Sequence, residues 1–360
     1  MRKLAEYATI QGLLLPETPE DHLRLIRLAY EFRRAVTYAT RMIARGVGER
    51  AALRELRSML NKAYGDSAYK VAKMLVRSCA SNGGDPRRIK IRKLFIISGG
   101  EASRKGNRNI RLGCGYVLIK YPFDGSWLKF RCCFGKYSGL IEELAQLATE
   151  KKVSYGARIV FRRGRIYLHL SVPVELYLKH FRRGRASGSH VAGFDFNSDR
   201  INMVIVDEYG KIRDARTEWF PEVTSHGYPR SKARARRLEA LARLLDYAYH
   251  HGVGVVAFEN LFLVKRGEFT GCARANRKIS KFAKRQLIQH AILMARKYGF
   301  KVILVDPKGT TKSREHDEAM RRHGLDRHAA SAYLVALRGI ERCTTCLLYT
   351  SPSPRDLSTS

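Results

Sequence analysis

The chain has 360 residues, which is enough for two or three domains. Hydrophobic residues make up 45% of it, so it can bury real cores and is not a globally disordered protein. Its 68 Lys and Arg against 33 Asp and Glu give a formal net charge of +35, and the clustering of the basic residues favours a nucleic-acid partner that neutralises them.

The sequence also bears on the compartment. No stretch has the length of a transmembrane helix, and charges interrupt residues 1–10, which excludes a signal peptide there. The seven cysteines are scattered and odd in number, which is typical of reduced thiols. We therefore expect a cytoplasmic protein with no membrane partner.

The chain opens with a predicted strand over residues 3–12, and a helix follows. Thr18 can cap that helix, and Pro19 suits its first turn. Apolar residues then recur at helical spacing, and two more helical segments are predicted at residues 49–62 and 67–79. The first 80 residues are therefore expected to be mostly helical, with basic outer faces.

Strand-like alternation replaces this pattern from residue 88 to about residue 174. Glycine-containing turns separate the candidate strands, which cover residues 89–97, 109–112, 116–121, 127–134, 157–161 and 166–172. Residues 162–165 (Arg-Arg-Gly-Arg) have the composition of a hairpin tip, and residues 142–150 that of a short helix. The pattern predicts a small antiparallel barrel.

A basic linker at residues 181–190 precedes a change to an α/β pattern. The predicted order is strands at 191–197, 201–206 and 211–217, helix 231–251, strand 253–258, helix 279–298, strand 301–305 and helix 325–338. Such an order predicts a mixed sheet in which the first strand lies beside strand 253–258.

Three acids stand at the ends of these elements. Asp195 lies at the end of the first strand, Glu259 follows strand 253–258, and Asp326 begins the last helix. In the predicted sheet the two strand-end carboxylates meet, and the helix lays Asp326 over them. Three such oxygen ligands suit Mg²⁺ or Mn²⁺ shared with a substrate phosphate. The set predicts phosphodiester hydrolysis by a two-metal mechanism.

Each acid taken alone also has a structural explanation. Asp195 and Glu259 could be turn acids, and Asp326 alone is most simply an N-cap. However, Asp195 and Glu259 each follow an apolar run, which predicts burial, and a lone buried carboxylate is costly. Three acids in this topological order favour catalysis.

The same segments resemble the RuvC-type nuclease domain of the TnpB family, proteins of insertion sequences that are similar to type V CRISPR effectors. Residues 193–197 (Gly-Phe-Asp-Phe-Asn) resemble the first RuvC motif and residues 255–261 (Val-Val-Ala-Phe-Glu-Asn-Leu) the second. Residues 326–332 (Asp-Arg-His-Ala-Ala-Ser-Ala) resemble the third, and residues 305–311 the segment that precedes it.

The resemblance implies an α/β RNase H-like (RuvC) nuclease domain over residues 191–341. An N-terminal antiparallel β-barrel, the wedge of the family, would carry a helical recognition insert. Residues 1–16 would supply the first barrel strand, 17–82 the insert and 83–180 the remaining barrel. The implied activity is RNA-guided DNA cleavage. Its partners would be a guide RNA, target DNA and a transposase encoded nearby.

The sequence departs from this family in two places. Many members carry a four-cysteine zinc ribbon before the third motif, whereas residues 307–325 contain no cysteine, so no structural zinc is predicted. His328 also stands where the third motif usually has Asn. Residues 342–360 are expected to be a disordered tail that is a sequencing artefact.

Clusters of basic residues are candidates for phosphate contact, although a solvated helix face is the simpler explanation of each. The candidates are Arg87, Arg88, Lys90, Arg162, Arg163, Arg165, Arg234, Arg236, Arg237, Arg277, Lys278, Lys281, Lys284 and Arg285.

Two other functions remain open on the sequence. One is a nucleic-acid-binding protein whose catalytic site has decayed, against which the intact acids argue. The other is a guide-independent nuclease of the RNase H or resolvase type, against which the large basic N-terminal half argues.

Overall fold

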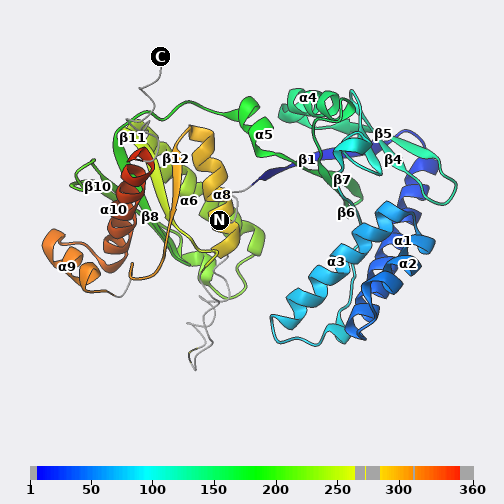
Figure 1. Ribbon diagram of the computed structural model, residues 1–360, viewed down its shortest axis with the longest axis horizontal. Helices are drawn as coiled ribbons and strands as arrows, with labels where there is room; N and C mark the ends of the chain where they lie inside the picture. The colour runs from blue at the N-terminus through cyan, green and yellow to red at the C-terminus, as the bar shows by residue number, and fades with distance from the viewer. Residues whose placement is uncertain (1–5, 264–271, 273–283, 311–312, 349–360) are drawn as a thin grey trace, which may run out of the picture. The chain divides into compact units, whose positions relative to one another are not determined.

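The computed structural model describes residues 6–263, 272, 284–310 and 313–348, and for residues 284–286 and 344–348 the backbone alone. The chain divides into two compact units, which are described separately (Figure 1). One consists of Glu6–His180, and the other contains the described residues from Phe181 onward.

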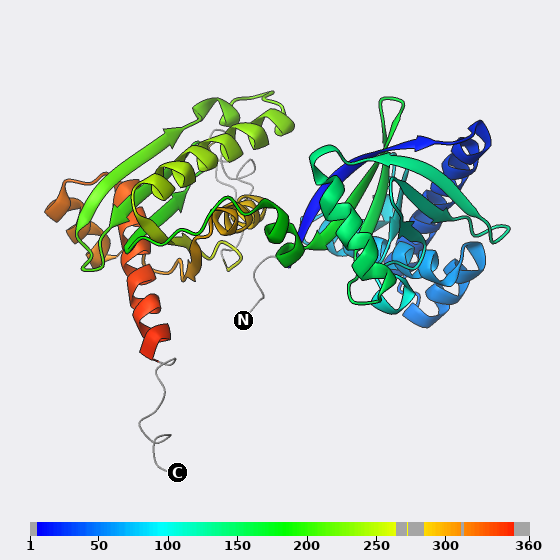
Figure 2. The same cartoon turned by 90° about the horizontal axis from the view of Figure 1, so that it is seen from above.

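Helix α1 (Pro19–Ala44) of the first unit begins where the sequence predicts. The hydroxyl of Thr18 accepts a hydrogen bond from the Asp21 amide at 3.1 Å, which satisfies one of the free amides of the first turn. Two further helices follow, α2 (Glu49–Met59) and α3 (Lys62–Ala80), and the three form the blue helices of Figures 1 and 2. The predicted helical segment is thereby confirmed.

The remainder of this unit is a seven-stranded antiparallel sheet in the order β2-β6-β7-β1-β5-β4-β3. Its strands are β1 (Tyr7–Pro16), β2 (Phe95–Ser98), β3 (Ile110–Leu112), β4 (Tyr116–Lys120), β5 (Trp127–Cys133), β6 (Gly156–Arg162) and β7 (Arg165–Pro173). Two short helices accompany them, α4 (Ser138–Thr149) and α5 (Val174–Phe181), and α5 was not anticipated from the sequence.

The barrel predicted for this region is instead an open sheet, because the short strands β2 and β3 form its two edges. The buried side chain of Asn107 occupies the gap between them. Its Oδ1 accepts from the Ser98 hydroxyl at 2.6 Å and from the Ile110 amide at 3.0 Å. A side-chain amide thus joins the ends of β2 and β3 where a closed barrel would have a backbone ladder.

The second unit has a five-stranded mixed sheet in the order β10-β9-β8-β11-β12. Its strands are β8 (His190–Phe196), β9 (Arg200–Val206), β10 (Ile212–Trp219), β11 (Val253–Glu259) and β12 (Lys301–Val305). Strands β8, β9 and β10 pair antiparallel, whereas β8, β11 and β12 pair parallel. This confirms the predicted mixed sheet and the predicted neighbours β8 and β11.

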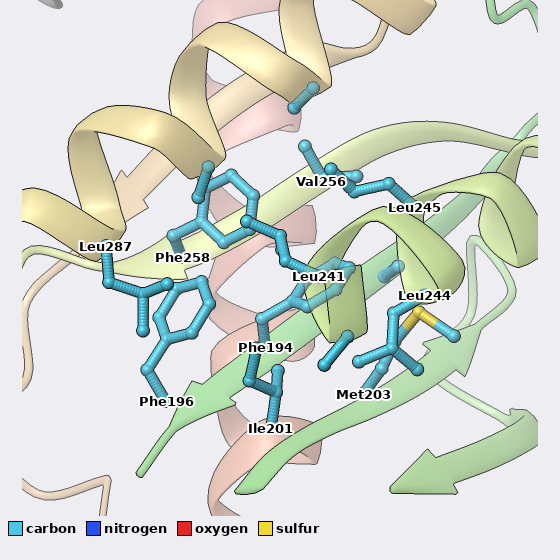
Figure 3. Close-up of a cluster of buried hydrophobic side chains, with 14 of the residues drawn as sticks. Phe194, Phe196, Ile201, Met203, Leu241, Leu244, Leu245, Val256, Phe258 and Leu287 are labelled. Carbon is cyan, nitrogen blue, oxygen red and sulfur yellow. The ribbon is translucent and has the colours of Figure 1, made fainter. Parts of the chain in front are cut away.

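Helices cover both faces of this sheet. They are α6 (Arg230–His250), α8 (Lys284–Tyr298), α9 (Arg314–His323) and α10 (Arg327–Leu348). One face packs against α6 and α8 through a core centred on Phe194, Phe196 and Phe258 (Figure 3). The other face packs against α10, which crosses β8. Because side chains alternate along a strand, the residues next to these phenylalanines point toward α10.

Gly193 allows α10 to lie directly on β8. A Cβ at this position would lie 2.1 Å from the carbonyl oxygen of Ala332 and 2.4 Å from the amide nitrogen of Ala336, which is closer than atoms can pack. The absence of a side chain therefore sets the distance between strand and helix. It also brings the N-terminal turn of α10 to the end of β8.

The C-terminal part of α10 includes residues 342–348, which the sequence assigns to a disordered tail; residues 349–360 lie outside the described part. None of the helices in the described residues combines the length and the apolar run that a membrane crossing requires.

Candidate functional site

Asp195 and Glu259 stand at the carboxyl ends of two adjacent parallel strands. Phe194 of β8 pairs with Phe258 of β11, and each acid is the next residue of its strand. Both phenylalanines lie in the α6 and α8 core, so both carboxylates point to the α10 face. Each acid is only 7% exposed. The predicted meeting of these two side chains at one end of the sheet therefore agrees with the strand register.

The carboxylate of Asp195 has two side-chain partners. The Asn197 amide nitrogen donates to its Oδ2 at 2.6 Å, and Nδ1 of His328 lies 3.0 Å from the same oxygen. Asn197 Nδ2 is also 3.0 Å from His328 Nδ1. The amide has two hydrogens, so it can serve both acceptors when Nδ1 of His328 carries no proton, whereas an Nδ1–H of the ring would donate to Asp195 itself.

The carboxylate of Glu259 is held by a residue from a distant part of the sequence. The buried hydroxyl of Thr310 lies 2.5 Å from Oε1 of Glu259 and 2.8 Å from the carbonyl oxygen of Pro307. A hydroxyl has one hydrogen, so it donates to one of the two at a time. Thr310 belongs to the segment that resembles the one before the third RuvC motif, and that resemblance was the signal for its place here.

Asp326 is the N-cap of α10. Its Oδ1 accepts hydrogen bonds from the amides of His328 at 2.8 Å and Ala329 at 2.7 Å, and the residue is exposed. Within the described part of the chain, no group of three or more His, Cys, Asp or Glu is arranged to hold a metal ion. The shared metal site of Asp195, Glu259 and Asp326 therefore stays a prediction.

Two amide oxygens beside the acids lack partners. Asn202 of β9 pairs directly with Asp195 and is 1% exposed. Its Nδ2 donates to the Thr217 hydroxyl at 2.7 Å, but its Oδ1 has no hydrogen-bond partner in the described chain, and the same holds for Oδ1 of Asn260. Such buried acceptors are costly unless something binds them. The sequence signal for Asn202 was one polar residue inside an apolar strand.

These donors fit a hard divalent cation. Carboxylate and amide oxygens are the ligands that Mg²⁺ and Mn²⁺ prefer. The end of the sheet combines two nearly buried carboxylates, Asp195 and Glu259, with the Asn202 amide oxygen, which has no partner in the described chain. A cation there would offset the electrostatic cost of placing two carboxylates side by side.

The predicted phosphate-binding residues of the first unit are exposed. Arg87 and Arg88 lie in a short 3-10 helix, and Lys90 follows it. Arg162, Arg163 and Arg165 lie at the β6–β7 turn, as predicted, where Arg163 and Gly164 have positive φ of 49° and 71°. A two-residue turn with positive φ at both positions matches the twist of the flanking strands, and it projects the three guanidinium groups into solvent.

The candidates on α6 differ from one another. Arg234 and Arg236 are exposed, although Arg236 is paired with Glu222 at 3.1 Å. Arg237 is only 6% exposed, and its Nη2 donates to the carbonyl oxygen of Ser198. Burial also lowers the pKa of this guanidinium group. A buried Arg237 holds the β8–β9 turn and is at odds with the phosphate contact predicted for it.

The remaining candidates are not described in atomic detail. Arg277, Lys278 and Lys281 lie outside the described residues, and for Lys284 and Arg285 the structure gives only the backbone of α8.

Comparison with known proteins gives relatives along almost the whole chain. The family model described as SSO2105 N-terminal domain matches residues 7–182. The uncharacterized protein SSO2105 of Saccharolobus solfataricus is 40% identical over 345 residues, covering 93% of this chain and 92% of its own. Two uncharacterized proteins of Aeropyrum pernix are each 32% identical over 305 residues, covering 78% of this chain and 80% and 71% of theirs.

Solved structures give weaker matches. RuvC of T. thermophilus in complex with a Holliday junction aligns with a TM-score of 0.30 and 17% identity, covering 45% of this chain and 97% of its own. A CRISPR-Cas12f ternary complex aligns with a TM-score of 0.32 and 11% identity, covering 88% and 81%. Both scores are below 0.5, and neither match bears on the function of this chain. By its sequence identity to SSO2105 over nearly its full length, the chain belongs to the SSO2105 family.

Proposed function

We propose that this protein is a divalent-metal-dependent DNA endonuclease of the TnpB type, directed by a guide RNA. The observation that carries the proposal is the pair of nearly buried carboxylates, Asp195 and Glu259, at the carboxyl ends of adjacent parallel strands. The strand order supports it too, because it is the mixed sheet expected for an RNase H-like domain. The motif resemblance supplies the reaction class.

Each acid has a role in the proposed site. When bound, Mg²⁺ or Mn²⁺ would activate water and stabilise the leaving oxygen of a phosphodiester. Asp195 and Glu259 would hold the cation, while Asn197 and Thr310 orient their carboxylates through the hydrogen bonds described above. Both amide bonds to Asp326 end on Oδ1, so Oδ2 is the oxygen that would turn toward the site.

The nucleic-acid partners follow from charge. A formal net charge of +35 and exposed arginines, including Arg163 and Arg234, suit a polyanion bound through its backbone. Base pairing of the guide RNA would then supply the sequence specificity. A transposase encoded nearby is a further partner that the TnpB resemblance implies.

The test is cleavage of target DNA by the full chain with the RNA encoded beside its gene and Mg²⁺. We expect Asp195→Asn and Glu259→Gln each to slow cutting by roughly a thousandfold, because several kcal/mol of transition-state stabilisation would be lost. RNA binding by both variants should equal that of the unaltered protein.

Asp207→Asn is the matched control, since Asp207 is a buried acid of the same sheet and lies outside the proposed site. If the unaltered protein binds RNA and DNA but does not cut, the decayed binding protein is the better description. Cutting without RNA would favour the guide-independent nuclease.

A further inference from the structure

A groove in the first unit lies along α1 and has a volume of about 910 Å³. Its lining includes Tyr30, Arg34, Tyr38 and Arg41 from α1, Glu55 from α2, and Arg92 from the segment before β2. All of these elements belong to the same compact unit. Nothing in the proposed nuclease site uses this groove.

The four α1 residues form one stripe of the helix. Tyr30, Arg34, Tyr38 and Arg41 are spaced by four, four and three residues, which places them on one face. The opposite side of α1 is buried, so this stripe is the side that the unit leaves open. Tyr30 is 49% exposed and Tyr38 is 42% exposed, and the side chain of Arg34 is 71% exposed. Tyrosines and arginines thus alternate along an open surface.

Neighbouring arginines fix the position of the first ring. The guanidinium group of Arg33 lies 4.9 Å from the ring centroid of Tyr30, and its Nη1 donates to the carbonyl oxygen of Arg92. This cation–π contact covers one side of the ring and holds it at the groove wall. Because the ring is already held in place, little side-chain entropy is lost when a flat ligand stacks on its exposed side.

We infer that this groove binds a single-stranded segment of RNA, with bases stacked on Tyr30 and Tyr38 and phosphates held by Arg34, Arg41 and Arg92. A duplex hides its base faces, so it would leave the two rings without a partner. The rings are separated by a helical rise of about 12 Å, which is the span of a few nucleotides.

Of the two acids that line the groove, Glu31 pairs with Arg34 at 3.2 Å, and Glu55 favours RNA over DNA. Glu55 is exposed on α2 and faces a surface of arginines, where a carboxylate would only repel phosphate. A carboxylate accepts hydrogen bonds, and the 2′-hydroxyl is a donor that RNA carries at every nucleotide. The inference rests on the proposed function only in naming the guide as the source of this RNA.

The experiment measures binding of a fluorescent unstructured RNA of about ten nucleotides to the full chain in EDTA, by anisotropy over a range of salt concentrations. We expect Tyr30→Ala and Tyr38→Ala each to weaken binding by roughly five- to a hundredfold, and the two phenylalanine variants to retain it. Arg34→Ala should reduce the salt dependence. Because EDTA removes divalent ions, a failure of the nuclease proposal does not affect this measurement.

Arg54→Ala is the control for charge, since Arg54 is exposed on α2 outside the groove lining, and it should change affinity little. Ultraviolet crosslinking followed by peptide mapping should place the RNA on α1. Equal affinity of the alanine variants and the unaltered protein would overturn the site. Equal affinity for DNA of the same sequence, together with no effect of Glu55→Ala on RNA binding, would overturn the assignment to RNA.

Discussion

The two ends of the five-stranded sheet each contain a nearly buried aspartate, and the two have different surroundings. Asp207 follows β9 and therefore lies at the end opposite Asp195, because β9 runs antiparallel to β8. It is 6% exposed against 7% for Asp195. Its Oδ1 accepts from the amides of Tyr209 and Lys211, and its Oδ2 pairs with Arg213 at 3.0 Å.

This comparison separates a structural acid from a candidate catalytic one. Burial alone would raise the pKa of Asp207, but the two amides and the Arg213 guanidinium group outweigh it and lower the pKa. Two amides and a guanidinium group thus serve both of its oxygens. Asp195 is instead contacted by the Asn197 side-chain amide and by His328, and a second carboxylate, Glu259, stands at the end of the adjacent strand. The two aspartates are therefore buried to a similar degree but differ in their neighbours. Asp207 is satisfied by backbone amides and an arginine, whereas Asp195 lies beside another acid.

The largest loss of stability at the Asp195 end of the sheet should come from displacing α10. Gly193→Ala places a Cβ against the backbone of α10, which cannot yield as a side-chain end could. We expect a loss of about 3 kcal/mol in the free energy of unfolding, at the upper end of ordinary overpacking. Chemical denaturation measures it, and cutting should be lost as well because His328 moves away from Asp195.

The control for this variant is Gly99→Ala. Gly99 is exposed and also lacks a positive φ, and a Cβ there would meet nothing within 4 Å. The free energy of unfolding of this variant should stay within about 0.5 kcal/mol of that of the unaltered protein. Equal denaturation midpoints for the Gly193 and Gly99 variants would show that α10 is free to shift.

A smaller effect is expected from the ring beside Asp195. His328→Ala removes the group 3.0 Å from Oδ2, so the carboxylate is less well oriented. We expect binding of Mn²⁺, measured by calorimetry without nucleic acid, to weaken roughly 10- to 100-fold, as for other residues that orient metal ligands. His328→Asn should recover part of this loss. His323→Ala, an exposed histidine of α9, should not alter Mn²⁺ affinity, and an equal loss there would point to adventitious binding.

The smallest effect, a slight change in Tm, should come from Asp207 at the opposite end of the sheet. The pKa of Asp207 in the folded protein is below its unfolded value of about 3.9, so its contribution to stability is present above that pH and is lost as the pH falls through the folded pKa. Asp207→Asn should therefore lower Tm slightly at neutral pH and flatten its decline in acid. Parallel Tm curves for the two proteins would contradict this assignment.

Much of the second unit could be predicted because its signals are local. The hairpin of strands followed by alternating helices and strands determined the neighbours β8 and β11, and the strand ends then determined where Asp195 and Glu259 lie. Likewise, Thr18 and Pro19 marked the start of α1.

What could not be predicted depends on packing. Arg237 reads as one of a run of cations, but it falls at helical spacing with buried Ala233, Leu241 and Leu244 on α6, so the tertiary fold buries it. The open edges of the first sheet depend on the shortness of β2 and β3, which alternation does not reveal. The sequence also does not determine the direction of the Asp326 side chain. The same residue can cap its own helix or face the other acids.

The crossing of α10 over β8 has a consequence for synthesis. Both strands that carry acids leave the ribosome before the helix that covers them, and translation proceeds at roughly 5–20 residues per second. For several seconds a growing chain therefore holds two neighbouring negative charges with no histidine beside them. In the proposed nuclease, the acid site would therefore be incomplete until α10 docks.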